Sequence, residues 1–182
     1  MIHKLAAFAF ALVLPCLYMT ATGQIEYFHT GPLIEDYGPV AAVEGREPIP
    51  EGTVFKVSFD IVNRTESGTL NRKLVSAARF LNMHTQAGVS HENISLALVI
   101  HGSAVHDMTN AAFYSQSNEL ENENAALIAE LLKHGVNIYI CGQSAAFNGI
   151  TKSDLLPGVR LSLSAMTSHA LLQQDGYTLN PF

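Results

Sequence analysis

Cys141 and His101 have side chains suited to nucleophilic chemistry near neutral pH, and each stands at the end of a hydrophobic run. Cys141 ends a hydrophobic run and precedes the small-residue turn Gly142-Gln143-Ser144. His101 ends a second hydrophobic run, Ile94 to Ile100. The thiolate is the nucleophilic form of cysteine, and a neighbouring imidazole can take the thiol proton. Cys141 is therefore a candidate nucleophile, and His101 is a candidate base or proton donor beside it.

The residues around Cys141 favour a reactive thiol but do not require one. A short helix is predicted from about Gln143 to Phe147, and its unpaired backbone N–H groups would stabilise a thiolate. Gly142 permits a sharp turn and leaves the sulfur uncrowded. Free cysteine is also among the most buried residue types, so Cys141 could simply fill space at the end of a strand. Position alone leaves both interpretations open.

The histidines of the chain do not form a recognised metal-binding pattern. His101 could bridge loop backbone through its two ring nitrogens instead of serving the thiol. His106 and Asp107 follow it, but a five-residue spacing across a predicted turn is no known ligand arrangement. No metal or cofactor is therefore expected. We expect the remaining scattered histidines on the solvated surface: His84, His91, His134 and His169.

Residues 1–23 have the pattern of a secretory signal peptide. A short positive start ends at Lys4, an apolar run extends from Leu5 to Met19, and small residues precede the expected cleavage site at Gly23. A membrane anchor needs about 20 apolar residues, and this run is shorter and contains Pro15. We predict a periplasmic or secreted protein without stable membrane insertion after cleavage.

An uncleaved or lipidated N-terminus is the alternative, although Cys16 follows Pro15 where a small residue would be usual. Cleavage would leave Cys141 as the one cysteine, which excludes an internal disulfide. The mature domain would then depend on its hydrophobic core and on subunit contacts. The net charge of −6 and the absence of a Lys/Arg-rich run make nucleic acid an unsuitable partner.

Residues 24–52 are predicted to form an extended arm. This stretch contains four prolines and four glycines, a density that forbids a long helix or a central strand. Its apolar side chains are too numerous for a free linker, so we expect the arm to dock on the domain or on a neighbouring subunit. These side chains are Tyr27, Phe28, Leu33, Ile34, Tyr37 and Val40.

Residues 53–182 alternate between strand and helix patterns. Strands are predicted at residues 54–62, 94–100, 136–141, 160–163 and 177–180, and helices at 67–86, 111–114, 121–134, 143–147 and 165–174. This alternation predicts a three-layer α/β/α fold with a mostly parallel five-stranded sheet. In such sheets ligands bind outside the carboxyl ends of the strands. If the strands ending at His101 and Cys141 are neighbours, both residues face one crevice.

Several segments together resemble the DsrE/DsrF-like (YchN-like) family. They are Leu98 to Val105, the helix ending at Gly135-Val136, Ile140 to Ser144, Leu156 to Val159, and Leu171 to Tyr177. The resemblance covers about Thr53 to Phe182, and the arm before it is similar to that of exported members. It implies a doubly covered parallel sheet and assembly into homotrimers or homohexamers.

The resemblance also implies a role for Cys141. The matching cysteine of the sulfur-relay members accepts sulfane sulfur as a persulfide and passes it on. His101 would polarise this sulfur, and the expected substrate-binding residues are Gly102, Ser103, Gly142, Gln143 and Ser144.

Two functions follow from these observations. The first is sulfur transfer or thiol redox chemistry at Cys141, with a sulfur donor or acceptor protein or a small sulfur compound as partner. The second is a non-catalytic oligomeric protein that binds a small ligand in the crevice. The sulfur-relay members work in the cytoplasm, whereas export is predicted for this chain, and an oxidising compartment makes a persulfide harder to protect. The family fold is therefore a firmer expectation than the family activity.

Overall fold

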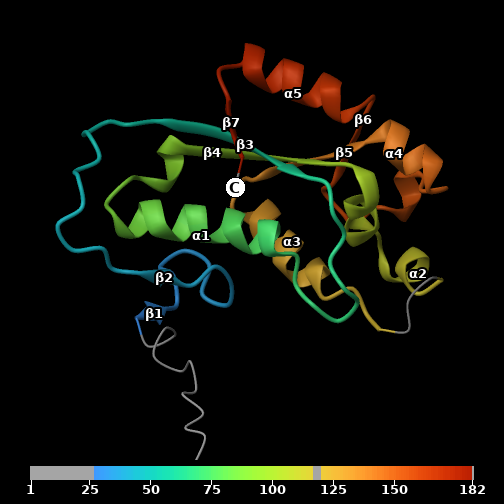
Figure 1. Cartoon of the computed structure of the whole chain (residues 1–182), viewed down its shortest axis with the longest axis horizontal. Coiled ribbons are helices and arrows are strands. Elements are labelled where there is room, and N and C mark those ends of the chain that lie inside the picture. Colours follow the sequence, from blue (N-terminus) through green and yellow to red (C-terminus); the bar gives the residue numbers. More distant parts are fainter. Residues whose placement is uncertain (1–26, 117–119, 182) are drawn as a thin grey trace, which may run out of the picture.

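The computed structural model describes residues 27–116 and 120–181 (Figure 1). The predicted signal peptide lies outside these residues. None of the helices in the described ranges is long and apolar enough to span a membrane.

Five parallel strands form the central sheet. They are β3 (Phe55–Ile61), β4 (Ile94–Ile100), β5 (Asn137–Cys141), β6 (Arg160–Ser162) and β7 (Thr178–Asn180). Their spatial order is β6-β5-β4-β3-β7, and every pairing is parallel. Successive strands therefore lie side by side from β3 to β6, and the chain then returns to place β7 beside β3. The prediction of a mostly parallel five-stranded sheet is confirmed.

Helices cover both faces of this sheet, as Figure 1 shows with α1 and α3 on one side and α5 on the other. The α-helices are α1 (Arg72–Gln86), α2 (Ala111–Tyr114), α3 (Asn124–Lys133), α4 (Gly142–Phe147) and α5 (Ala165–Gln174). Short 3-10 helices occur at η2 (His91–Asn93), η3 (Gly102–Met108) and η4 (Lys152–Asp154). The three-layer α/β/α architecture is thus also confirmed.

The side chains of β4 differ in size between the two faces of the sheet, and so do the two hydrophobic cores. Leu96, Leu98 and Ile100 join the larger core with α1 and α3, whereas the smaller Ala97 and Val99 join a second core under α5. All five residues are buried, as expected for a central parallel strand. The small side chains let α5 approach the sheet closely. Cys141 belongs to this second core.

Helix α1 begins five residues later than the hydrophobic periodicity predicts. Gly68 has a φ of +77°, which a helix does not allow. The side chain of Asn71 then caps the helix by accepting a hydrogen bond from the Lys73 N–H at 3.0 Å. Helix α3 similarly begins at Asn124 rather than Glu121, because the Asn122 amide donates to backbone carbonyls of η3 instead of continuing the helix.

The N-terminal arm docks on α1 of its own domain. Its two short strands, β1 (Phe28–His29) and β2 (Val40–Ala41), pair antiparallel as a separate two-stranded sheet. Buried Asn82 of α1 holds the segment between them, accepting from the Ile34 N–H at 2.8 Å and donating to the Ile34 carbonyl at 2.9 Å. Gly38 packs against α1 so closely that a Cβ there would lie 2.3 Å from the Arg79 nitrogen.

Candidate functional site

Cys141 is the last residue of β5 and the N-terminal capping residue of α4. It is 6% exposed and is the one free cysteine among the described residues. Its backbone is extended, at φ −66° and ψ 116°, and the chain turns into helix directly after it. The alternation of β5 directs Ile138 and Ile140 into the core under α1 and α3, and Cys141 toward α5.

The sulfur of Cys141 lies within a set of hydrogen-bond donors. Burial alone would raise the thiol pKa, but hydrogen bonds from the Ser144 N–H and hydroxyl and from the backbone N–H groups of Ala165 and Gln143 outweigh it. The pKa of Cys141 is therefore lowered from its ordinary value. Two elements supply these donors, the first turn of α4 and the start of α5. The arrangement stabilises a negative charge on sulfur.

Gly142 is required at its position by the close approach of β6. A Cβ on this residue would lie 2.5 Å from the Ser162 carbonyl oxygen and 3.1 Å from that of Leu163. The absence of a side chain therefore lets the start of α5 reach the sulfur. Gln143 reinforces this contact, because its side-chain amide donates to the Leu163 carbonyl at 3.3 Å.

Ser144 connects the thiol with the end of the neighbouring strand. Its hydroxyl oxygen accepts a hydrogen bond from the Gly102 N–H at 3.1 Å, and its hydroxyl also bonds to Cys141. Gly102 itself has a φ of +57°, and a Cβ there would lie 2.8 Å from the Val62 carbonyl oxygen. The turn after β4 thus holds Ser144 in place.

His101 and Cys141 lie at the ends of adjacent strands, so the condition under which the sequence predicted them to face one crevice is met. They follow the register pair Ile100 and Ile140, and parallel neighbours are about 4.8 Å apart. The His101 ring nevertheless has another hydrogen-bond partner. Its Nε2 lies 3.0 Å from the Asp60 carboxylate at the end of β3. The structure thus brings Asp60, His101 and Cys141 to one edge of the sheet.

His169 of α5 completes a hydrogen-bonded cluster with Asp60. Its Nε2 lies 2.8 Å from the same carboxylate oxygen that His101 contacts. Burial raises the pKa of Asp60, but the hydrogen bonds from His169 and His101 outweigh it and leave this pKa below its usual value. The described residues hold no group of His, Cys, Asp or Glu side chains arranged to bind a metal ion.

The expectation that the scattered histidines lie on the solvated surface is wrong. All four are half-buried: His84, His91, His134 and His169. His84 packs against the rings of Phe55 and Phe80, and His91 packs against His134. An imidazole ring packs well against apolar neighbours, and periodicity alone does not show where tertiary contacts form.

Four of the predicted substrate-binding residues line one open depression. Gly102, Ser103, Gln143 and Ser144 surround a cavity of about 440 Å³ together with Phe147 and Asn148. Ser103 also has a structural role, because its hydroxyl oxygen accepts from the Arg64 N–H at 3.0 Å. The remaining predicted residue, Gly142, contacts the β6–α5 connection instead.

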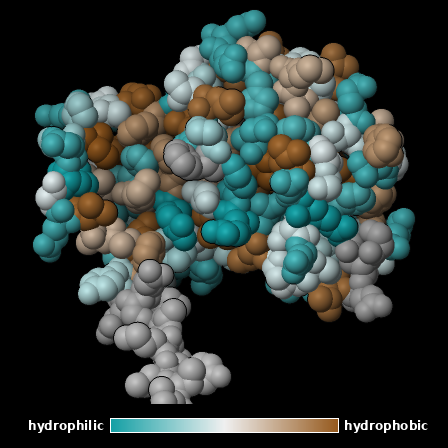
Figure 2. All heavy atoms as spheres, viewed as in Figure 1, coloured by the Kyte–Doolittle hydropathy of each residue, from teal (hydrophilic) through white to brown (hydrophobic). Residues whose placement is uncertain are grey.

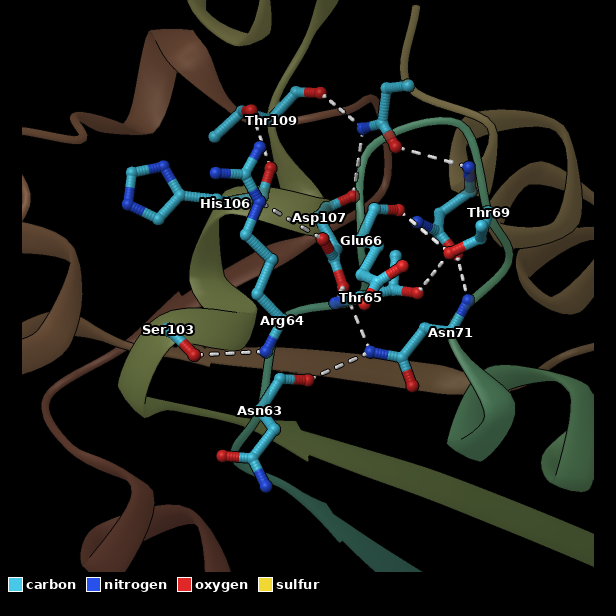
Figure 3. Close-up of polar contacts among 12 residues, drawn as sticks. Asn63, Arg64, Thr65, Glu66, Thr69, Asn71, Ser103, His106, Asp107 and Thr109 are labelled. Atoms are coloured by element: carbon cyan, nitrogen blue, oxygen red, sulfur yellow. Dashed lines mark hydrogen bonds and ion pairs between the residues drawn. The ribbon is translucent and has the colours of Figure 1, made fainter. Parts of the chain in front are cut away.

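A second polar cluster surrounds Asp107 in η3 (Figure 3). Asp107 is fully buried. Its Oδ2 accepts from the Asn71 amide at 2.9 Å and the Thr65 N–H at 3.2 Å, and Arg64 Nε lies 3.8 Å from Oδ1. Burial raises the pKa of Asp107 above the usual carboxyl value despite these donors. This cluster joins the β3–α1 loop to η3. Nearby, His106 lies 3.0 Å from the side-chain oxygen of Asn148.

Asp60 and His169 did not emerge from the sequence as site residues. Asp60 had a usable signal, because Val57, Phe59 and Ile61 alternate with it and leave it on the opposite face near the carboxyl end of β3. No comparable signal existed for His169. The contact of His169 with Asp60 depends on where the chain places α5 after β6, and no local pattern shows this.

These features define an all-parallel α/β/α protein with one buried thiol at the carboxyl edge of its sheet. A family model, the DsrE/DsrF-like family, matches residues 56–181. The chain belongs to this family. No curated protein matches the sequence.

Two solved structures are similar to this chain. One is MTH1491, a protein of unknown function from Methanobacterium thermoautotrophicum, with 20% identity and a TM-score of 0.53 over 70% of this chain and 99% of that one. The other is the ychN protein from E. coli, with 15% identity and a TM-score of 0.52 over 71% of this chain and 100% of that one. At these identities the similarity concerns the fold.

Proposed function

We propose that this protein is an exported sulfur carrier in which Cys141 accepts sulfane sulfur as a persulfide. One observation carries the proposal: Cys141 caps the N-terminus of α4 at the carboxyl end of β5, where donor groups of Ser144, Ala165 and Gln143 lower the pKa of its thiol. A thiolate stabilised in this way is present at neutral pH in a larger fraction than an ordinary thiol. Membership of the DsrE/DsrF-like family supports the same chemistry.

The reaction balances without an external oxidant when the donor is a polysulfide. The Cys141 thiolate attacks a terminal sulfur atom, a new S–S bond to Cys141 forms, and the donor's S–S bond breaks. The electron pair of the broken bond leaves with the shortened polysulfide dianion. Cys141 then carries a persulfide anion, which the donors around the sulfur would stabilise. Attack by an acceptor thiolate on the outer sulfur would regenerate the Cys141 thiolate.

Intact-mass spectrometry after incubation with polysulfide tests this proposal. We expect the wild-type protein to gain the mass of one sulfur atom and the Cys141→Ser variant to gain none. A matched control is Ser153→Ala, which removes an exposed hydroxyl from the 3-10 helix η4 and should leave the adduct unchanged. If the folded wild type gains no sulfur and Cys141 resists alkylation until the protein is unfolded, the carrier function is wrong.

A ligand-binding role without covalent chemistry is the second candidate. The depression beside the thiol favours it, because this cavity of about 440 Å³ combines backbone groups of Gly102 with the exposed ring of Phe147. Cys141 is not among the lining residues of this depression, so in that case the ligand would bind beside the thiol without reacting with it. Failure of sulfur uptake together with saturable binding of a small ligand that Phe147→Ala abolishes would favour this role.

We propose in addition that the chain forms a homotrimer or homohexamer through the surface beside the thiol. Phe147, Leu163 and Met166 are 90%, 71% and 79% exposed, and they belong to α4, the β6–α5 connection and α5. Figure 2 shows hydrophobic residues among hydrophilic ones along the upper edge, where Figure 1 places α5. Large apolar side chains with this exposure on neighbouring elements are candidates for burial in a subunit interface. Sedimentation of wild type and Met166→Glu tests the proposal, and a monomeric wild type would contradict it.

A further inference from the structure

One turn of α5 contacts both the thiol and the cluster of Asp60 with two histidines. The backbone N–H of Ala165, the first residue of α5, helps to lower the pKa of Cys141. His169, one turn later, contacts Asp60 through its side chain. Ala165 and Cys141 also pack together in the smaller core, so the start of α5 lies beside both groups.

The Asp60 carboxylate determines which ring nitrogen of each histidine carries the proton. An ionised carboxylate only accepts hydrogen bonds, so neutral His101 and His169 must both donate from Nε2. In a neutral imidazole the other nitrogen, Nδ1, is then a proton acceptor. His101 thus has a basic Nδ1 one strand away from Cys141. Without Asp60 the ring would be free to adopt either tautomer.

Both histidines contact the same carboxylate oxygen, Oδ1 of Asp60. The side chain of His169 is only 18% exposed, against 29% for His101 and 34% for Asp60. Nδ1 of His169 is buried and has no hydrogen-bond partner among the described residues. A buried acceptor without a donor is unfavourable, so this ring is held by its bond to Asp60. His169 in turn limits rotation of the carboxylate.

We infer that Asp60 and His169 are positioning residues that hold His101 in the tautomer able to exchange a proton with Cys141. This inference rests on the proposed sulfur-carrier function. The thiol S–H bond breaks, an N–H bond forms at His101 Nδ1 directly or through one water, and the resulting imidazolium lies against the Asp60 carboxylate. The thiolate then attacks the sulfur donor. The imidazolium returns the same proton to the departing sulfur.

Nitrogen-15 NMR of the histidine rings tests the positioning step itself. We expect the wild type to show His101 as the Nε2–H tautomer, with the signal assigned from its loss in His101→Gln. In Asp60→Asn the side-chain amide can offer a donor to one ring, so His101 should change to a tautomer mixture. The surface variant Asp175→Asn is the matched control and should leave the spectrum unchanged. An unaltered His101 tautomer in Asp60→Asn would overturn the inference.

The pH dependence of Cys141 alkylation tests the proton exchange without any sulfur donor. We expect Asp60→Asn to reduce the rate at neutral pH about tenfold, the lower end of the loss seen when the carboxylate that orients a metal-ligating histidine is removed. His169→Gln should reduce it by a smaller factor, because Asp60 still contacts His101. A merely structural role would lower stability but leave the pH profile of the remaining folded protein unchanged. Such a result would overturn the inference.

These measurements separate the inference from the function on which it rests. If wild type takes up no sulfur while the tautomer and the alkylation profile respond as expected, the carrier function fails and the positioning role stands. If wild type takes up sulfur and Asp60→Asn does so at the wild-type rate at every pH, the positioning role fails and the carrier function stands. A zinc ion retained by Asp60, His101 and His169 in the purified protein would also overturn the inference, because metal ligation would replace the Nε2–H bonds.

Discussion

Asp60 and Asp107 are two aspartates near the same edge of the sheet, and their environments shift their pKa values in opposite directions. Asp60 is one-third exposed and contacts two imidazoles, which lower its pKa. Asp107 is fully buried, and its direct hydrogen bonds come from the Asn71 amide and the Thr65 N–H. Burial raises its pKa. Asp60 can therefore serve chemistry that needs a carboxylate in contact with water, whereas Asp107 serves to hold loops together.

The difference shows how burial and partners compete at a carboxyl group. Desolvation is the largest influence on both pKa values and raises each of them. Only at Asp60 do the partners outweigh it, because two histidines donate to one oxygen. The Arg64 Nε near Asp107 is 3.8 Å away, too far for a hydrogen bond. A perturbed carboxyl is thus a functional candidate at Asp60 and a structural element at Asp107.

The largest expected difference between the two aspartates is in the unfolding free energy lost when each is replaced by alanine. We expect Asp107→Ala to lower the free energy of unfolding by about 3 kcal/mol, since it leaves the buried Asn71 amide and the Thr65 N–H without their acceptor. Asp60→Ala should cost less than about 1 kcal/mol, because its site is open to water. Urea denaturation followed by circular dichroism measures both values, with Asp175→Ala as the surface control. Equal losses at the two aspartates would remove the distinction between them.

Asn71, a neutral side chain in the Asp107 cluster, should affect the stability of the protein and not the reactivity of Cys141. Asn71 caps α1 and also bonds to Asp107 and the Asn63 carbonyl, so Asn71→Ala should cost about 2 kcal/mol of unfolding free energy. Cys141 should still be alkylated at the wild-type rate. The control is Asn110→Ala, which removes the cap of the short helix α2 and should cost less. A slower alkylation of Cys141 in Asn71→Ala would show that the two regions are coupled.

The two aspartates should give stability a pH dependence of opposite sign. Because the pKa of Asp107 is raised, its contribution is fully present below the unfolded value, about 3.9, and is lost as pH rises through the folded pKa. Because the pKa of Asp60 is lowered, its contribution is present above about pH 3.9 and is lost as pH falls through the folded pKa. The wild-type minus Asp107→Asn difference in unfolding free energy should therefore decrease with pH, and the Asp60→Asn difference should increase. Parallel slopes would contradict the assigned directions.

Ser144→Ala should have the smallest effect and should act on reactivity rather than on stability. Loss of its hydroxyl removes one of the hydrogen bonds that lower the Cys141 pKa. One hydrogen bond corresponds to about 1 kcal/mol, so the alkylation rate at pH 7 should fall by roughly fivefold. The unfolding free energy should change little. A rate equal to that of wild type would show that backbone donors alone stabilise the thiolate.

Much of the fold could be predicted from the sequence because it depends on local patterns. The near-continuous apolar run at residues 94–100 identifies a doubly covered strand, and the observed β4 has the same bounds. The predicted helix at residues 165–174 also matches α5. Two helix starts were predicted too early. The left-handed backbone of Gly68 and the hydrogen bonds of Asn122 delay the start of α1 and α3. The spacing of hydrophobic residues does not reveal either effect.

Within the candidate site, the sequence predicted the continuous turn after β5 and, provided that the two strands are neighbours, the nearness of His101 to Cys141. Cys141, Gly142, Gln143 and Ser144 form one continuous turn, and the strand-to-helix transition there suggested a set of backbone donors. The Ala165 N–H, the fourth donor to the sulfur, comes from a different element. Its approach depends on the bare Cα of Gly142 under the β6–α5 connection. The sequence showed a glycine at position 142, but it did not show that the β6–α5 connection packs against this residue.

By itself the sequence determined the alternation of elements, the parallel sheet, and the position of Cys141 and His101 at strand ends. These properties follow from hydrophobic periodicity and chain direction. Only the tertiary structure decided that β3, β4 and β5 are neighbours in register, that α5 returns over them, and that Asp60 and His169 meet His101 there. Strand order and helix docking are set by the packing of distant side chains. The physical reason is that partners 41 and 109 residues apart have no shared local pattern.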